Sequence, residues 1–486
     1  MSARLCKDDF AHLVERQLSQ WERAQAASGK KGWRAHLADG AAIDYITISR
    51  ELGSGGEEIG RLLAEMTGWQ CYDRDILNCM AENMNVHVRA LESVDEKTID
   101  VIDDWLLPLL GGRSSKHVEQ LSYYKHLGKM LMVIAQHGRA IIVGRAAGLV
   151  LPRERGLSVR VTAPFEVRCK RYAAEHDMEL GQALTLVQKA DDMKGRFVQD
   201  FVGKDVRDSR HYDLVIDTGK LPPRAVAKLL WRALDERVIS KQARQQAPGE
   251  GPDLDAIVER QMREWSAEGK KERGAARARL VSGAEVDYIT LTRDEGSGGQ
   301  EAAQLLGKLL GWRVYDHEVL DYMAQRMDVH VRMLEGLDER ALSWINDRLM
   351  PFMAGKSFQQ VRQSRYYHHL GEQLLIIAMH GRAIILGRGA AQLLPREKGL
   401  SVWVTAPLEM RYRRYAAEKG LRLDAATRQV KQADKEYRRF VQSFVDKKMD
   451  DPSYYDLICN TEKFTSRSVA KLISRAFDKR AFGERD

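Results

Sequence analysis

Short apolar blocks alternate with longer amphipathic stretches along the chain, and this pattern predicts strands connected by helices. The run at 45–49 is apolar and β-branched, and a glycine-rich turn separates it from a predicted helix at 56–67. In the same way the pattern predicts strands at 70–72, 140–143, 158–162 and 213–216, and helices near 8–27, 75–137, 164–176, 181–201 and 222–238. Strands that alternate with helices indicate an α/β fold in which a parallel sheet is covered by helices on both faces.

This pattern occurs twice in the sequence. The segment DYITISR at 44–50 returns as DYITLTR at 287–293, an offset of 243 residues. From residue 44 onward the same offset aligns the two halves without a gap, and it relates the sequence GSGG at 53–56 to that at 296–299. A period of this length is far too long for a solenoid repeat, so it indicates a domain duplicated in tandem.

The repeat also places the domain boundaries. A single core stops growing near about 250–300 residues, so a chain of 486 residues is expected to hold more than one domain. We expect a helical arm at 1–40, a first copy at 41–241, a linker at 242–253, a second helical arm at 254–284 and a second copy at 285–486. Gln, Ala, Pro and Gly cluster without periodicity in the linker. The two copies could form an intramolecular pseudo-dimer.

Composition narrows the class of protein. An apolar fraction of 44% excludes global disorder, and no run approaches the roughly 20 apolar residues of a membrane span. The five cysteines are scattered without a C-x-x-C pair, and the histidines lack an H-E-x-x-H spacing. We therefore expect neither disulfides nor a protein-built metal site. The start of the chain has no apolar secretory segment, and a cytoplasmic location fits these features best.

The net charge of +8 raises the question of nucleic acid as a partner. Neither half of the chain has a long basic run or a basic stripe interleaved with aromatic residues. Nucleic acid is therefore disfavoured, and arginines that face a small polyanionic ligand explain part of the charge better.

The glycine-rich turn after the first strand is a candidate phosphate site, because glycines let the backbone approach and free N–H groups point at the anion. It departs from the Walker A pattern G-x-x-x-x-G-K-[ST], since in the first copy Gly56 stands in place of the lysine and glutamates replace the hydroxyl residue. Arg50 and Arg293 end the two strands beside the turns and could supply the missing charge. The alternative is a purely structural turn whose acidic residues stabilise the helix dipole.

Five segments in a fixed order connect the chain to a known family. S-R-E-x-G-S-G-G-x-E-I, Tyr-Asp, I-I-V-G-R, V-T-A-P-x-E-x-R and Y-D-L-V-I-D-T resemble the cytidylate kinase-like proteins, which are relatives of the bacterial cytidylate kinases in the P-loop nucleoside monophosphate kinase group. The resemblance covers both copies almost end to end. It implies a three-layer P-loop kinase-like domain in each copy, with ATP as phosphoryl donor, Mg²⁺ as the metal and a nucleoside monophosphate such as CMP as acceptor.

The resemblance also implies roles for individual residues. The turn would cradle the donor's β-phosphate, Asp73 would lie at the acceptor site and Arg145 would grip the acceptor phosphate. The implied catalytic residues are Arg145, Arg168 and Arg171, with Arg388, Arg411 and Arg414 in the second copy. The implied nucleotide-binding residues are Arg50, Gly53, Ser54, Gly55, Gly56, Asp73, Asp191 and Arg196, with Arg293, Gly296, Ser297, Gly298, Gly299, Asp316, Asp434 and Arg439.

Several of these residues have a structural alternative. Arg168 and Arg171 lie on a charged helix that could be a solvated face, and Asp191 and Arg196 could be a surface ion pair. Asp191 and Arg196 are nevertheless identical in the two copies, whereas their neighbour Lys194 is replaced in the second copy by a tyrosine.

Three functions remain open from the sequence. The leading one is ATP-dependent phosphoryl transfer to a nucleoside monophosphate, which needs positioning and charge neutralisation more than a nucleophile or base. The second is a nucleotide-binding regulatory or scaffold protein that has lost catalysis. Its support is the missing Walker residues and the substitution of an acceptor-site aspartate of cytidylate kinases by Ala146 and Gly389. The third is a kinase with another small-molecule acceptor.

Overall fold

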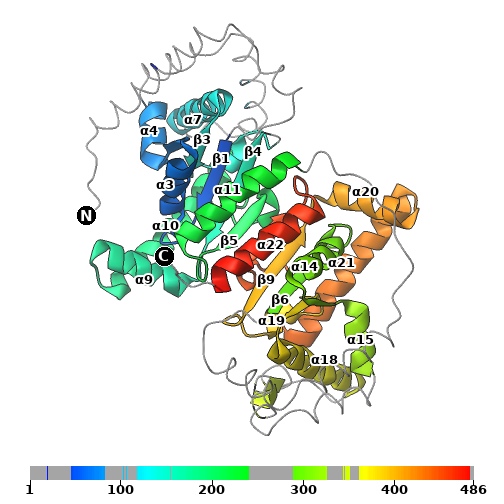
Figure 1. Cartoon of the computed structure of the whole chain (residues 1–486). Helices are drawn as coiled ribbons and strands as arrows, with labels where there is room; N and C mark the ends of the chain where they lie inside the picture. The colour runs from blue at the N-terminus through cyan, green and yellow to red at the C-terminus, as the bar shows by residue number, and fades with distance from the viewer. Residues whose placement is uncertain are drawn as a thin grey trace. The chain divides into compact units, whose positions relative to one another are not determined.

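The structure is a computed structural model of the whole chain. The residues it describes are 45–82, 118–153, 155–239, 288–325 and 361–481, with isolated helical positions at 19, 102, 106, 343, 345–347, 349 and 350. The chain divides into two compact units, Met1–Val238 and Ile239–Asp486 (Figure 1). The linker and the second helical arm predicted from the sequence lie outside the described residues, as does the first arm apart from Ser19.

The described part of the first unit contains a sheet of five parallel strands. They are β1 (Tyr45–Arg50), β2 (Gln70–Tyr72), β3 (Ala140–Val143), β4 (Gly156–Thr162) and β5 (Leu214–Asp217), in the spatial order β2-β3-β1-β4-β5. β1 lies between β3 and β4 and pairs Ile48 with Val143 and Val159. Since neighbouring strands run in the same direction, the residues that follow β1 and β3 come together at one edge of the sheet.

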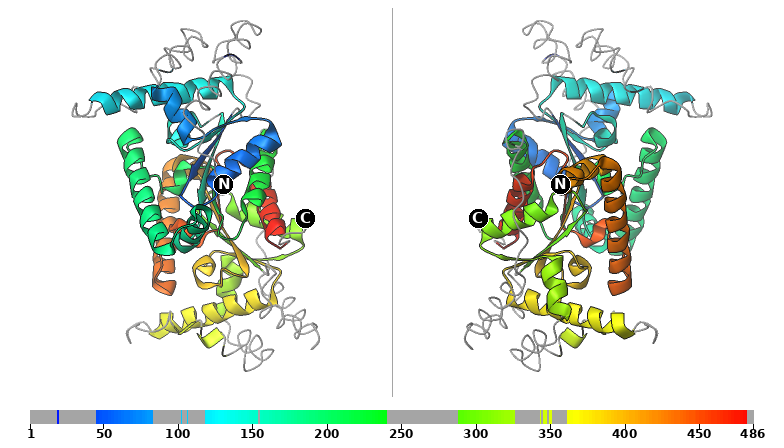
Figure 2. Two further views of the ribbon diagram at one scale, coloured as in Figure 1. Left: turned by 90° about the vertical axis from the view of Figure 1, so that its left-hand side faces the viewer. Right: turned by 90° about the vertical axis from the view of Figure 1, so that its right-hand side faces the viewer.

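Helices cover both faces of this sheet. They are α3 (Gly56–Thr67), α4 (Arg74–Glu82), α7 (Val118–His137), α8 (Ala147–Val150), α9 (Phe165–His176), α10 (Leu180–Val202) and α11 (Pro223–Ile239), with a 3₁₀ turn η1 at Ser209–His211. α3 and α11 lie on one face and α10 on the other (Figure 2). Because both faces are covered, successive strand residues such as Ile141 and Ile142 are both buried.

The second unit repeats this architecture. Its strands are β6 (Tyr288–Arg293), β7 (Arg313–Tyr315), β8 (Ala383–Leu386), β9 (Gly399–Thr405) and β10 (Leu457–Asn460), in the order β7-β8-β6-β9-β10. Its helices are α14 (Gly299–Leu310), α15 (His317–Gln325), α18 (Val361–His380), α19 (Ala390–Leu393), α20 (Leu408–Lys419), α21 (Leu423–Val445) and α22 (Ser466–Ala481), with η3 at Pro452–Tyr454. In the described parts of both units, no helix is long and apolar enough to cross a membrane.

An aromatic cluster connects α10 to α7 in the first unit. Tyr124 of α7 stacks on Phe201 of α10 with ring centroids 4.9 Å apart, and it meets Phe197 edge-on at 5.7 Å. Tyr367 and Phe444 form the same stack in the second unit at 5.4 Å. This packing fixes α10 and α21 beside the sheet, so that residues on these helices can contribute to a site at the sheet edge.

The predicted fold class is confirmed, and most described elements begin and end within two residues of their predicted bounds. α8 is a short helix that the sequence analysis did not predict. It begins after Ala146, which adopts a left-handed φ of 55° that no propensity rule would assign to alanine. The predicted helical stretch at 75–137 contains α4 and α7, and most of the chain between them lies outside the described residues.

Candidate functional site

The glycine turn, residues 51–55, connects β1 to α3 at the carboxyl edge of the first sheet. Gly53 has a φ of 76°, a conformation that residues with side chains rarely adopt. A Cβ at Gly53 would also overlap the carbonyl oxygen of Arg168, so this position needs glycine for space as well as for conformation. Ser54 is buried and donates its hydroxyl to the carbonyl oxygen of Glu51 at 2.7 Å, which closes the turn.

The first turn of α3 is open to an anion. Its N-cap residue is Gly55, with a φ of 77°, and no side-chain hydrogen bond caps the helix within the described part of the chain. The N–H groups at a helix start have no partner within the helix, and together with the helix dipole they favour a negative group. This uncapped helix start is the geometry expected of a phosphate site, and phosphate binding at the turn remains a prediction.

Arg50, the last residue of β1, lies across the turn toward the end of β3. It is 8% exposed, and a Cβ at Gly144 would overlap its Nη1 atom. Its Nη2 atom donates to Oε1 of Glu57 at 2.8 Å. Burial works to raise the pKa of Glu57, but the Arg50 charge and hydrogen bond outweigh it and lower that pKa. Arg50 therefore lies beside the turn, as predicted, and its charge is partly neutralised by the Glu57 carboxylate.

Arg145 follows β3 in a left-handed turn, in which the φ of Gly144 is 90° and its own φ is 49°. Such a conformation costs a residue with a side chain about 1–2 kcal/mol and is characteristic of functional sites. The guanidinium lies over the ring of Phe197 on α10, 4.9 Å from its centroid. Burial lowers the pKa of Arg145, and the charges of Arg74 and Arg50 act in the same direction. Cationic side chains therefore gather at this sheet edge.

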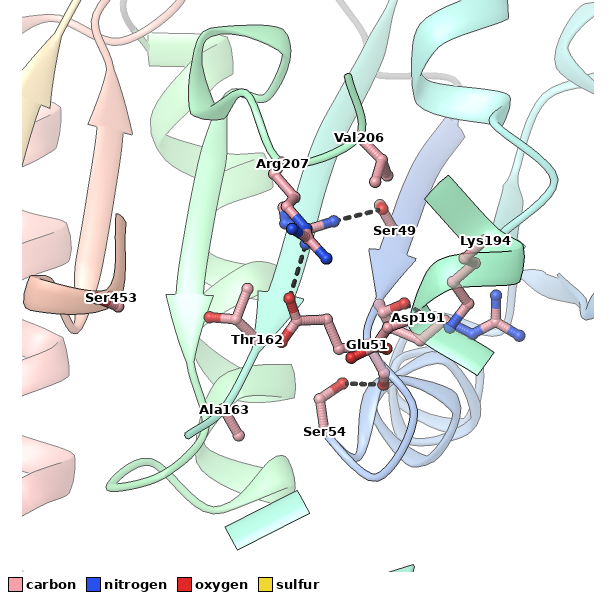
Figure 3. Close-up of polar contacts among 12 residues, drawn as sticks. Ser49, Glu51, Ser54, Thr162, Ala163, Asp191, Lys194, Val206, Arg207 and Ser453 are labelled. Atoms are coloured by element: carbon pink, nitrogen blue, oxygen red, sulfur yellow. Dashed lines mark hydrogen bonds and ion pairs between the residues drawn. The ribbon is translucent and has the colours of Figure 1, made fainter. Parts of the chain in front are cut away.

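α10 adds a lysine to this group. Lys194 is half-buried, and its Nζ atom donates to the carbonyl oxygen of Arg50 at 2.8 Å. Figure 3 shows its side chain beside Asp191 and near the start of the turn. Burial lowers the pKa of Lys194 to about 7, and the Arg50 charge adds to the effect. Comparison of the two copies does not identify this residue, because its counterpart is Tyr437.

Arg168 of α9 joins three segments around the turn. It is 5% exposed, so the alternative of a solvated face does not hold for this residue. Its Nη1 atom donates to Asp191 of α10 at 2.8 Å, and its Nε atom donates to the carbonyl oxygen of Ala163 at 3.1 Å. Its Nε atom also lies 3.3 Å from Oε2 of Glu51. These contacts hold α10 and the turn in place around the candidate site.

Arg171, one helical turn further on α9, supports the glycine turn through a threonine. Its Nη2 atom donates to the carbonyl oxygen of Thr218 at 2.7 Å, and its Nη1 atom to the Thr218 hydroxyl at 3.0 Å. That hydroxyl in turn donates to the carbonyl oxygen of Ser54 at 2.7 Å. Direct contact of Arg168 or Arg171 with a phosphoryl group remains a prediction from the resemblance.

Asp191 and Arg196 both line an open pocket of about 580 Å³ between α10 and residues 204–207. Within the described residues, the ion pair of Asp191 is with Arg168, and Arg196 is exposed, as is its counterpart Arg439. The alternative of an Asp191–Arg196 surface ion pair is therefore wrong. Arg196 is thus an exposed residue of the pocket lining, and its role in nucleotide binding remains a prediction.

Asp73 begins α4. Its Oδ1 atom accepts hydrogen bonds from the backbone N–H groups of Asp75 and Ile76, both at 3.0 Å. Asp316 accepts from the N–H of Val319 at the same distance in the second unit. Both aspartates therefore cap a helix, and their role at an acceptor site remains a prediction.

The second unit retains the supports of the glycine turn. Gly296 and Gly298 have φ angles of 75° and 80°. Arg411 donates to Asp434 at 2.5 Å, as Arg168 does to Asp191, and Arg414 bonds to Thr461 through both terminal nitrogens, at 2.6 and 2.8 Å. Gly299 begins α14 and the buried Ser297 precedes it, so the turn itself has the same geometry in both copies.

The charges around the second turn differ from those of the first. Arg388 forms an ion pair with Asp321, which also accepts a hydrogen bond from the Tyr366 hydroxyl at 2.7 Å. At the corresponding place the first copy has the neutral Asn78, which accepts from the Tyr123 hydroxyl at 2.9 Å.

Arg293 also differs from its counterpart, since it bonds to Glu295 and Gln300, both at 2.9 Å. The glutamate beside it has no acidic equivalent in the first copy, where the residue is Leu52.

Known proteins resemble both copies. The cytidylate kinase-like family matches residues 45–220 and 288–463, which together make up more than half of the chain. The cytidylate kinase of Methanothrix thermoacetophila is 23% identical over 190 residues, covering 39% of this chain and 96% of that protein. That of Methanocaldococcus jannaschii is 29% identical over 105 residues, covering 21% of this chain and 59% of that protein, so the match spans less than two thirds of this relative.

Among solved structures, a shikimate kinase from Acinetobacter baumannii in complex with shikimate is 15% identical, with a TM-score of 0.22, over 40% of this chain and 94% of that chain. A score this low carries no argument about function. The family match, by contrast, begins at the first strand of each sheet and runs past the last. The chain belongs to the cytidylate kinase-like family and contains the domain of that family twice.

Proposed function

We propose that the chain transfers a phosphoryl group from ATP to a nucleoside monophosphate, with a CMP-like acceptor. The observation that carries the proposal is the uncapped glycine turn at the sheet edge, with Arg50 and Arg145 at the ends of the two adjacent strands β1 and β3. Family membership supports nucleotide kinase chemistry. We also propose a cytoplasmic location, because the scattered cysteines of the sequence fit a reducing compartment.

The chemistry needs charge and position rather than a nucleophile or base. The backbone N–H groups after Gly55 would hold the donor's β-phosphate, and Arg145 would hold the acceptor phosphate, with Arg50 between the two. Mg²⁺ would supply further neutralisation of the phosphate charge. The described residues contain no group of three or more His, Cys, Asp or Glu side chains suited to a metal, so Mg²⁺ would be held largely by phosphates and water.

Two alternatives remain, each with its own support. Loss of catalysis is favoured by the ion pair of Arg50 with Glu57, which reduces the charge available to a donor phosphate. A different acceptor is favoured by Ala146, which stands where cytidylate kinases have an aspartate.

The test is ADP production by the full-length chain with ATP, Mg²⁺ and a panel of nucleoside monophosphates, together with calorimetric titration of ATP. Turnover that is highest with CMP or dCMP supports the proposal. ATP binding without turnover on any acceptor supports the regulatory alternative, and absence of nucleotide binding contradicts both. The double variant Arg50→Ala, Arg293→Ala tests whether these arginines replace the missing Walker lysine. Unchanged ATP affinity in this variant would show that they do not contribute to the donor site.

A further inference from the structure

Lys194 of α10 places a positive charge at the end of β1, where the first glycine turn begins. Its partner, the carbonyl oxygen of Arg50, is the last of β1, and 144 residues separate the two in sequence. Among the described residues, no carboxylate forms an ion pair with Lys194. A carbonyl is a weak partner for an ammonium ion, so the amine keeps capacity for a stronger acceptor.

The surroundings of Lys194 favour an anion. Arg50, Glu57, Asp191 and Arg160 all lie close enough to influence its charge, and the net effect with burial lowers its pKa. Both nearby carboxylates are already bound to arginines, Glu57 to Arg50 and Asp191 to Arg168. A half-buried amine beside arginines, without a carboxylate of its own, has the features of a site that awaits a negative ligand.

We propose that Lys194 is the phosphate-contacting cation of the first copy. Its positive charge, on α10, takes the place of the lysine that the turn lacks at Gly56. We further propose that the second copy is not an equivalent nucleotide site. This inference rests on the proposed function. The ligand group is the polyphosphate of the donor nucleotide, because Lys194 lies at the turn itself, whereas Arg145 lies after the neighbouring strand.

The second copy lacks this positive charge at three corresponding positions. Tyr437 replaces Lys194 and lies with its hydroxyl 3.5 Å from the place of a Cβ at Gly387. Asp321 neutralises Arg388 where the first copy has an amide. His317 replaces Arg74, and burial together with nearby arginines lowers the pKa of its imidazole, whereas the first copy has a guanidinium here. The turn geometry is the same in both copies, but the charge around it is not.

The experiment is calorimetric titration of the full-length chain with ATP and Mg²⁺. Wild type is expected to bind one ATP per chain. Lys194→Met and Lys194→Gln are expected to lower the affinity about 10-fold to 100-fold, the range for a lost charge-assisted hydrogen bond. The glutamine variant keeps a donor for the Arg50 carbonyl, which separates loss of charge from loss of the internal bond. Lys189→Met removes an exposed lysine from the same helix and should leave the affinity unchanged, as should Tyr437→Phe.

Thermal unfolding of each variant checks that it is folded. Two equivalent ATP sites per chain, or unchanged affinity in both Lys194 variants, would overturn the inference. If wild type then still produces ADP from ATP and a nucleoside monophosphate, the proposed function stands and only the assignment of Lys194 fails. If wild type binds no nucleotide, both fail together.

Discussion

Lys194 carries a charge that the fold does not compensate fully. Burial disfavours its ammonium form, Arg50 and Arg160 repel it, and Asp191 and Glu57 attract it. The result is a pKa of about 7, far below the usual value for lysine of about 10.4. The ammonium form of Lys194 therefore destabilises the folded protein at neutral pH unless an anion binds next to it.

This imbalance predicts a pH dependence of stability. Between pH 7 and about 10 the unfolded chain binds more protons at Lys194 than the folded chain does, so stability gained from this residue rises with pH. Wild type should accordingly gain stability relative to Lys194→Met as the pH rises from 7 to 10, measured as urea midpoints at each pH without nucleotide. The comparison with the variant cancels the titration of other groups. The difference in urea midpoint between Lys189→Met and wild type should stay constant with pH. If the difference between Lys194→Met and wild type is also constant, the charge of Lys194 is not buried.

Residues differ in how far the sequence could predict them. The position of Arg145 was predictable, because a basic residue just beyond the end of a buried strand must lie at the carboxyl edge of a parallel sheet. Its left-handed φ was not, since arginine has no preference for that conformation. The position of Lys194 beside the glycine turn was not predictable either, because it depends on how α10 packs against the sheet, through contacts such as those of Tyr124 with Phe201.

At the scale of elements, the strand–turn–helix order was sufficient to predict the glycine turn. The sequence could not show what surrounds it. The carbonyl oxygen of Arg168 lies against Gly53, and the Thr218 hydroxyl reaches the Ser54 carbonyl from after β5. These partners are over 100 residues away in sequence, and only the packing of α9 and β5 brings them to the turn.

The crowding around the turn predicts a difference between two glycines. Gly53 and Gly68 both have positive φ angles, 76° and 68°, but a Cβ at Gly68 would have nothing within 4 Å. Gly68→Ala should therefore cost about 1–2 kcal/mol from backbone conformation alone. Gly53→Ala should cost more, because the new methyl group meets the rigid backbone of Arg168. Chemical denaturation of the two variants measures the difference, and equal losses would show that the turn can move away from α9.

At the scale of the whole molecule, the duplication was evident from the constant offset, and the strand order agrees in both units. Whether the two copies are equivalent could not be deduced from the sequence, because most residues expected at the site are identical in both. The differences lie at their neighbours, where Asn78 corresponds to Asp321 and Lys194 to Tyr437. These substitutions leave the fold intact and change the charge offered to a ligand.

Non-equivalent copies predict an unequal response of the chain to nucleotide. Hydrogen exchange of the full-length protein with and without ATP and Mg²⁺ reports each copy separately. Binding should slow exchange in peptides from 51–60 and 190–202, because phosphate would accept hydrogen bonds from the turn and engage Lys194. The corresponding peptides from 294–303 and 433–445 should exchange at unchanged rates. At an ATP concentration that saturates wild type, Lys194→Met should lose most of this protection and Lys189→Met should retain it. Equal protection of both turns would mean that the charge around the second turn is sufficient for binding, and the two copies would then have to be treated as two sites of one kind.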